Sequence, residues 1–198
     1  ASGSHAVIFN GEEKQNVSFD NNYNHFNNLK TCEDYKGTIL INDYFGFTKL
    51  VSDIEFTSKD AVLSSTMDIN GYSMTVNGKL NTQGEIDINY GKVCVDGTLQ
   101  QIGGQINIDG GELYVNDDYI MAKDSKNSAT DEFEYTYTNY ADVSTKQLKM
   151  DKVADIVKIG GDFYCYPYSG VSLTAGNMYI GGDFTSNVVI NYSCNTPT

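Results

Sequence analysis

A pattern of short strands repeats about every twenty residues through the centre of the chain. Two columns of aliphatic residues keep the same spacing of 19 and then 20 residues: Ile69, Ile88 and Ile108 in the first, and Met74, Val93 and Leu113 in the second. Glycine stands near the end of each copy, where the backbone has to turn. The constant period in both columns predicts an all-β fold, a parallel β-solenoid of about 20 residues per coil.

Apolar and polar residues alternate within each expected coil, which assigns one side to the interior and the other to solvent. In the second copy we expect four aliphatic side chains inside: Ile86, Ile88, Val93 and Val95. The residues between them are expected to face outward: Asp87, Asn89, Lys92 and Cys94. Successive coils then stack at the usual inter-strand distance of about 4.8 Å and form a rod.

The whole chain, 1–198, is interpreted as one solenoid module with four parts. Residues 1–60 are β-rich but irregular and predict longer N-terminal coils, and residues 61–122 carry the regular coils. Residues 123–147 are polar, contain tyrosines and break the period, so they predict a projecting loop or hairpin. Residues 148–198 predict C-terminal coils.

Two features mark the C-terminal part. The motif Ile159–Phe163 recurs as Ile180–Phe184 after 21 residues, with the order Ile-Gly-Gly-Asp-Phe. Residues 151–158 are compatible with one short helix, and Leu148 and Met150 are equally compatible with strand positions on a wall of the solenoid.

Three segments near the N-terminus carry a resemblance to a known family: His5–Gly11, Gln15–Phe19 and Phe26–Leu29. With the coils that follow, they resemble a tandem β-solenoid module of large cell-surface adhesins and binding proteins of gut clostridial bacteria, some of which are superantigen-like immunoglobulin-binding proteins. The resemblance covers nearly the whole chain. It implies an extracellular location, on the bacterial surface or secreted, and neighbouring modules in the same chain. It assigns no binding residue.

Charge restricts the partners. The formal net charge is -13, and all 13 basic residues are lysines, without one arginine. Nucleic acid and anionic membranes repel such a chain, so we expect no nucleic-acid binding. No stretch approaches the roughly eighteen apolar residues of a membrane helix, so we expect no membrane insertion either. A neutral or positive partner is the better match. The resemblance implies a host protein such as an immunoglobulin, or a mucosal glycoprotein.

Tyrosine is abundant, with 15 residues and no tryptophan. Tyrosine is enriched at protein interfaces because it offers a large rigid surface and a hydroxyl at low entropic cost. Stacked tyrosines also form structural ladders on sheets, and this alternative stays open. The candidate binding residues are Tyr114, Tyr135, Tyr137, Tyr140, Tyr164, Tyr166, Tyr168 and Tyr179.

Two outward polar columns are expected beside the isoleucines: Asp68, Asp87 and Asn107, and Asn70, Asn89 and Asp109. Their oxygens could hold calcium, but we favour a solvated face on which amides separate the carboxylates. No metal or other cofactor is therefore expected.

Catalysis has little support in the sequence. His5 and His25 have no serine or cysteine partner at a recognisable spacing, Cys94 has no evident base, and no pair of carboxylates stands in a glycosidase motif. We therefore expect no enzyme and no catalytic residue. The four cysteines permit two disulfides or free thiols: Cys32, Cys94, Cys165 and Cys194.

Three functions remain. The favoured one is a non-catalytic surface module that recognises a host protein, in superantigen fashion where the partner is an immunoglobulin variable domain. The alternatives are a structural spacer or adhesin stalk, and a carbohydrate-binding or carbohydrate-active β-helix.

Overall fold

The computed structural model describes residues 7–13, 15–19, 29–32, 38–43, 47–50, 53–56, 60–63, 66–121, 146–165, 169–186 and 191–192. All 23 elements in these residues are β-strands. This part of the chain contains no helix of the length and apolarity that a membrane crossing requires.

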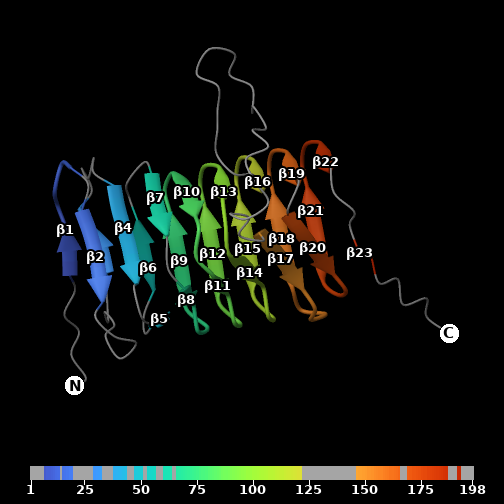
Figure 1. Cartoon of the computed structure of the whole chain (residues 1–198), viewed down its shortest axis with the longest axis horizontal. Coiled ribbons are helices and arrows are strands. Elements are labelled where there is room, and N and C mark those ends of the chain that lie inside the picture. The colour runs from blue at the N-terminus through green and yellow to red at the C-terminus, as the bar shows by residue number, and fades with distance from the viewer. Residues whose placement is uncertain are drawn as a thin grey trace, which may run out of the picture.

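The strands form three parallel sheets that run along the rod in Figure 1. Sheet A contains β1 (Val7–Phe9), β3 (Leu29–Thr31), β6 (Ile54–Phe56), β9 (Ser73–Val76), β12 (Lys92–Val95), β15 (Glu112–Val115), β18 (Ile156–Ile159) and β21 (Asn177–Ile180). Sheet B contains β2 (Gln15–Phe19), β4 (Thr38–Asp43), β7 (Asp60–Leu63), β10 (Lys79–Thr82), β13 (Leu99–Gln101), β16 (Tyr119–Met121), β19 (Phe163–Cys165) and β22 (Phe184–Ser186). Sheet C contains β5 (Phe47–Lys49), β8 (Thr66–Asp68), β11 (Ile86–Asp87), β14 (Gln105–Asn107), β17 (Lys146–Met150), β20 (Ser169–Leu173) and β23 (Asn191–Tyr192).

Each central coil adds one strand to sheet C, then one to sheet A, then one to sheet B, as in β8, β9 and β10. The predicted parallel β-solenoid is therefore confirmed. Met67 pairs with Ile86, 19 residues on, and Ile86 pairs with Ile106, 20 residues on. The coils near the N-terminus are longer, as expected: Gln15 pairs with Ile39, 24 residues on.

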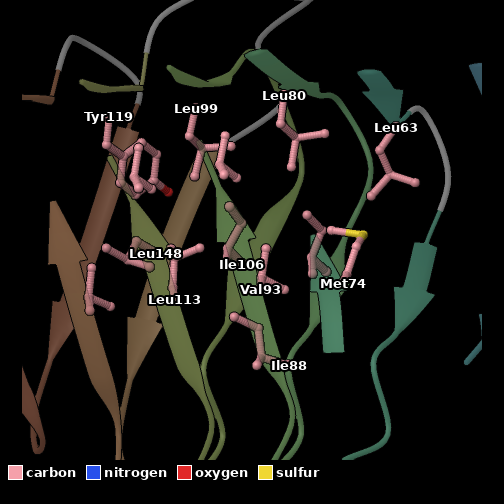
Figure 2. Packing of buried hydrophobic residues seen from close by; sticks show 14 of the residues in the cluster. Leu63, Met74, Leu80, Ile88, Val93, Leu99, Ile106, Leu113, Tyr119 and Leu148 are labelled. Atoms are coloured by element: carbon pink, nitrogen blue, oxygen red, sulfur yellow. The ribbon is translucent and has the colours of Figure 1, made fainter. Parts of the chain in front are cut away.

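The aliphatic files expected from the repeat lie inside the rod. Ile69, Ile88 and Ile108 are all 0% exposed and follow each other directly along sheet C. Figure 2 shows such files, contributed by strands of all three sheets and packed against each other across the interior. Full burial of an aliphatic side chain stabilises a fold by about 2 kcal/mol, so stacking along these files is the main source of stability.

The interior near sheet B also contains aromatic and polar side chains. The rings of Tyr119, Phe163 and Phe184 stack on successive coils, with centroid distances of 5.1 and 5.4 Å. The buried Tyr119 hydroxyl donates to Gln101 Oε1 at 2.7 Å. Gln101 Nε2 donates to the carbonyl oxygens of Gly104 and Gln147, at 2.9 and 3.2 Å. This amide therefore ties the interior of sheet B to the turn before sheet C.

The repeated Ile-Gly-Gly-Asp-Phe motif forms the corner between sheets A and B. The Asp118 carboxylate accepts the Asp162 N–H at 2.8 Å, and the Asp162 carboxylate accepts the Asp183 N–H at 2.7 Å. A β-carbon at Gly161 would overlap the Asp118 carboxylate. Glycine is needed here because it lets one coil's carboxylate reach the backbone of the next.

Of the two possibilities for residues 148–158, the strand is correct and the helix is not. Leu148 and Met150 lie in β17 with their side chains buried. Residues 151–155 form a corner around the fully buried Asp155, whose carboxylate accepts the N–H groups of Gly110, Asp151 and Lys152 at 2.6, 2.7 and 2.9 Å. A buried carboxyl group that accepts three hydrogen bonds favours this turn over a helix.

Two further expectations need comment. β17 begins at Lys146, inside the segment 123–147 that we expected to project, so the solenoid resumes earlier than predicted. The rest of the expected projection, 123–145, lies outside the described residues. Asp68 occupies its expected outward column but is only 5% exposed, because Asn89 Nδ2 from the next coil donates to its carboxylate and covers it.

Candidate functional site

The structure describes three of the eight candidate tyrosines. Tyr114 and Tyr179 lie on the outer face of sheet A, as the alternation predicts, and Tyr179 is 54% exposed. Tyr164 lies on β19 in sheet B, so it does not join the other two. The remaining five lie outside the described residues: Tyr135, Tyr137, Tyr140, Tyr166 and Tyr168.

Tyr114 and Tyr179 belong to one column of outward residues. Strand register places Cys94, Tyr114, Lys158 and Tyr179 at the same position on β12, β15, β18 and β21. Lys158 therefore stands between the two tyrosines, with its ammonium 5.0 Å from the Tyr114 ring centroid and 5.8 Å from the Tyr179 ring centroid. Lys92, on the neighbouring column, lies 4.3 Å from the Tyr114 centroid. We call Lys92, Tyr114, Lys158 and Tyr179 the tyrosine–lysine patch.

The patch is locally positive. Lys92 Nζ lies 4.0 Å from Glu112 Oε2, at the limit of an ion pair, and both side chains are well exposed. No carboxylate in the described part of the chain pairs with Lys158. Two lysines and one glutamate give this area a charge of +1 in a chain whose formal charge is -13. Cation–π contacts hold the ammonium groups in place while their remaining N–H donors stay available.

Cys94 precedes Tyr114 in the same column, which continues to Thr75 on β9, and its chemistry is not that of a nucleophile. Burial raises the pKa of its thiol, and the nearby Lys92 does not reverse that shift. Cys94 is therefore a neutral free thiol at pH 7, since only the thiolate attacks or binds metals readily.

Tyr164 has an internal role. Its hydroxyl donates to Asp162 Oδ2 at 2.6 Å, at the corner where the Asp162 carboxylate also accepts the Asp183 N–H. These two hydrogen bonds, that from Tyr164 first, lower the pKa of Asp162. The register neighbours of Tyr164 are Ile120 and Thr185, so it belongs to no ladder of stacked tyrosines, and its assignment as a binding residue stays a prediction.

The polar columns beside the buried isoleucines lie on the outer face of sheet C. Amides from the next coil donate to the carboxylates: Asn89 Nδ2 to Asp68 Oδ1 at 3.2 Å, and Asn107 Nδ2 to Asp87 Oδ1 at 2.5 Å. They do not separate the carboxylates as we expected, because Asp68 and Asp87 are direct neighbours in register. No group of three or more His, Cys, Asp or Glu side chains within the described residues has a geometry that could hold a metal ion.

The chain matches no family model, no curated protein and no solved structure. Its function therefore has to be argued from the geometry of its own surfaces.

Sequence reasoning missed the two lysines of the patch. Lys92 was placed outside by the alternation, and Lys158 stands at the corresponding outward position of a later coil. Lys92 meets Tyr114 through the pairing of β12 with β15 in adjacent coils. The contact of Lys158 depends on the pairing of β15 with β18, which are separated in the chain by residues 116–155. A repeat search can find that register only after the period-breaking segment has been removed from the alignment of coils.

Proposed function

We propose that this chain is a non-catalytic binding module of the bacterial cell surface, or of a secreted protein, that recognises a host protein through the outer face of sheet A. The tyrosine–lysine patch carries the proposal. Two tyrosines and two lysines lie on adjacent parallel strands, in fixed register, on a face of a rigid rod. Rigid aromatic side chains with adjacent hydrogen-bond donors are typical of protein-recognition surfaces.

The composition of the patch favours a protein partner over the other classes. A charge of -13 with few lysines repels nucleic acid and anionic lipid over most of the surface. Within the patch, Tyr179 offers an exposed ring and the Lys158 ammonium offers free donors beside it. A protein surface with an apolar group next to a carbonyl or carboxylate matches this combination.

The family resemblance makes the proposal more specific. It favours an immunoglobulin variable domain bound outside the antigen site, in superantigen fashion, or a mucosal glycoprotein. Either partner is extracellular, in agreement with the proposed location. A spacer that only lifts other domains from the cell wall is the alternative, because stacked coils in three continuous sheets form a rod.

Affinity capture tests the proposal. The immobilised 198-residue chain is exposed to serum and to mucus, and the retained proteins are identified by mass spectrometry. We then expect the variant Tyr114→Ser with Tyr179→Ser to weaken binding of the captured protein at least about tenfold, since aromatic residues dominate binding energy at interfaces.

Tyr72→Ser provides the matched control, because Tyr72 is 37% exposed but lies outside sheet A. Equal binding by the double variant and the control would exclude the patch as the interface. A chain that retains no protein at micromolar concentration would support the spacer instead.

A further inference from the structure

We propose that a groove on the outer face of sheet C binds a neutral, hydroxyl-rich sugar chain. This inference goes beyond the protein-binding function, because it concerns a different face of the rod and a different class of ligand. The groove has a volume of about 330 Å³, at the lower end of the range of small-molecule sites. Its lining consists of four carboxylates, two amides and two ammonium groups: Asp68, Asp87, Asp109, Asp151, Asn89, Asn107, Lys149 and Lys152.

The lining follows from the strand register. One outward column runs through Asp68, Asp87, Asn107 and Lys149 on successive strands of sheet C. The next outward position in the same coils supplies Asn89, Asp109 and Asp151. Hydrogen-bonding groups therefore repeat along the groove at the coil spacing of about 4.8 Å, so a ligand that itself repeats along its length can use them in succession.

Opposite charges within the groove are already paired. Lys149 Nζ lies 2.9 Å from Asp151 Oδ2, and Lys152 Nζ lies 3.7 Å from Asp109 Oδ1. The Lys149 pair lowers the pKa of Asp151 and raises that of Lys149, so both groups stay charged around neutral pH. Each ammonium has three N–H donors and each carboxylate about four acceptor positions, so the pairs leave donors and acceptors available side by side.

This mixture selects against anions. Four carboxylates and two ammonium groups give the lining a formal charge of -2, which repels an anion, and both lysines are paired with carboxylates of the groove. The described residues also include no metal-binding group of three or more His, Cys, Asp or Glu side chains. A hydroxyl group, in contrast, donates one hydrogen bond and accepts others. A neutral ligand with many hydroxyls is therefore the class that satisfies adjacent carboxylate acceptors and ammonium donors together.

An exposed aromatic ring completes the site. Tyr90 is 71% exposed and directly follows Asn89, a lining residue, in the chain. Its ring lies against Gly110, next to Asp109: a β-carbon placed at Gly110 would be 2.6 Å from Tyr90 Cε1. Tyr90 also holds a left-handed backbone conformation, with φ of 60°. Tyr90 does not itself line the groove, but an amphipathic ring next to the lining residues Asn89 and Asp109 offers the apolar C–H face of a bound sugar a place to pack.

The test is a panel of neutral oligosaccharides of several linkages on a glycan array, followed by titration calorimetry of those that bind to the wild-type chain. We expect at least one neutral oligosaccharide to bind, and Tyr90→Asn and Lys149→Gln each to weaken it at least about fivefold. Asparagine tolerates the left-handed backbone at position 90, and the Lys149 side chain is 42% exposed, so both variants should fold. Circular dichroism checks that they do.

Two controls separate this site from the proposed function. The Tyr114→Ser, Tyr179→Ser variant should keep full sugar binding, and Tyr90→Asn should keep full binding of the captured host protein. Calcium chloride and spermidine are each titrated alone. We expect neither to show saturable binding that is lost in the Tyr90→Asn and Lys149→Gln variants. The inference is overturned if no neutral sugar binds, if both groove substitutions leave sugar binding unchanged, or if calcium or spermidine binds in the groove instead.

Discussion

Glycine positions in this chain differ in what a side chain would encounter. Gly104 has a φ of 68°, and a β-carbon there would overlap the Gly84 carbonyl of the preceding coil. Gly71 has a φ of 78°, but a β-carbon there would meet nothing within 4 Å. The first position therefore requires glycine for its backbone conformation and for the close stacking of coils, and the second for its conformation alone.

Alanine substitution at these two glycines should separate the two costs. We expect Gly71→Ala to reduce the free energy of unfolding by about 1 kcal/mol, the cost of a left-handed alanine. Gly104→Ala adds steric overlap and should cost about 3 kcal/mol or more. Urea unfolding followed by circular dichroism compares them, and equal midpoints would show that the coils can separate at Gly104 without loss.

The hydrogen bonds of the Asp162 carboxylate, at the corner between sheets A and B, should make the stability of this corner depend on pH. Hydrogen bonds from Tyr164 and from the Asp183 N–H lower its pKa. A lowered pKa in the folded state stabilises the fold above the ordinary carboxyl pKa, and this contribution is lost as the pH falls through the lowered value. We expect Tyr164→Phe to move the pKa of Asp162 back toward its ordinary value, as measured by NMR titration of the side-chain carboxyl. If the pKa of Asp162 does not change, the hydrogen bond from the Asp183 N–H alone accounts for its lowered value.

At the scale of elements, a buried polar network inside the rod connects sheet B to sheet C. Gln101 on β13 accepts from Tyr119 on β16 and donates to carbonyls of Gly104 and Gln147, in the turn before β14 and in β17. Gln101 and Tyr119 are both 0% exposed, and burial raises the pKa of Tyr119 well above its ordinary value, so its hydroxyl remains a donor. Such a buried network fixes how sheet B meets sheet C.

A double-mutant cycle should detect this connection. Gln101→Leu leaves the Tyr119 hydroxyl without its acceptor, and Tyr119→Phe leaves the Gln101 carbonyl oxygen without its donor. Because the double variant removes both groups, its loss of unfolding free energy should be smaller than the sum of the single losses by about 1 kcal/mol. Strict additivity in urea unfolding experiments would show that the two groups do not interact.

At the scale of the whole molecule, the sheets have open ends within the described residues. β21 and β22 have strand neighbours on one side only, and so do β1 and β2. The interior aromatic ladder ends on Phe184, which is 45% exposed, whereas Phe163 before it is fully buried. Unpaired strand edges and an exposed core residue favour addition of another strand, and head-to-tail contacts of this kind do not close.

The 198-residue chain should therefore associate end to end at high concentration. We expect sedimentation velocity at physiological salt, where the negative charge is screened, to show larger species as concentration rises. Phe184→Lys should reduce this association, since lysine blocks strand edges. Tyr72→Lys also replaces an aromatic residue by lysine, at a 37% exposed position just before β9 in the middle of the rod, and serves as the control. A strict monomer, or equal association of both variants, would contradict open ends.

The sequence by itself determined the class of fold, because a solenoid repeats one local rule. The spacing of Ile69, Ile88 and Ile108 and the alternation around Val93 require only that each coil bury its aliphatic residues against the next. Both columns, their burial and the outward position of Tyr114 follow from that rule. The family resemblance and the functions that it implies remain predictions.

Only the tertiary structure decided which outward residues meet. Lys158 reaches Tyr114 because β18 pairs with β15 across a segment that breaks the period. The Tyr164 hydroxyl donates to the Asp162 carboxylate. The Asp155 carboxylate accepts N–H groups from two coils, those of Gly110 and Asp151, and so stabilises a corner. These contacts depend on register between strands distant in the chain. Periodicity predicts that coils stack, but the lengths and corners of individual coils decide which side chains lie side by side.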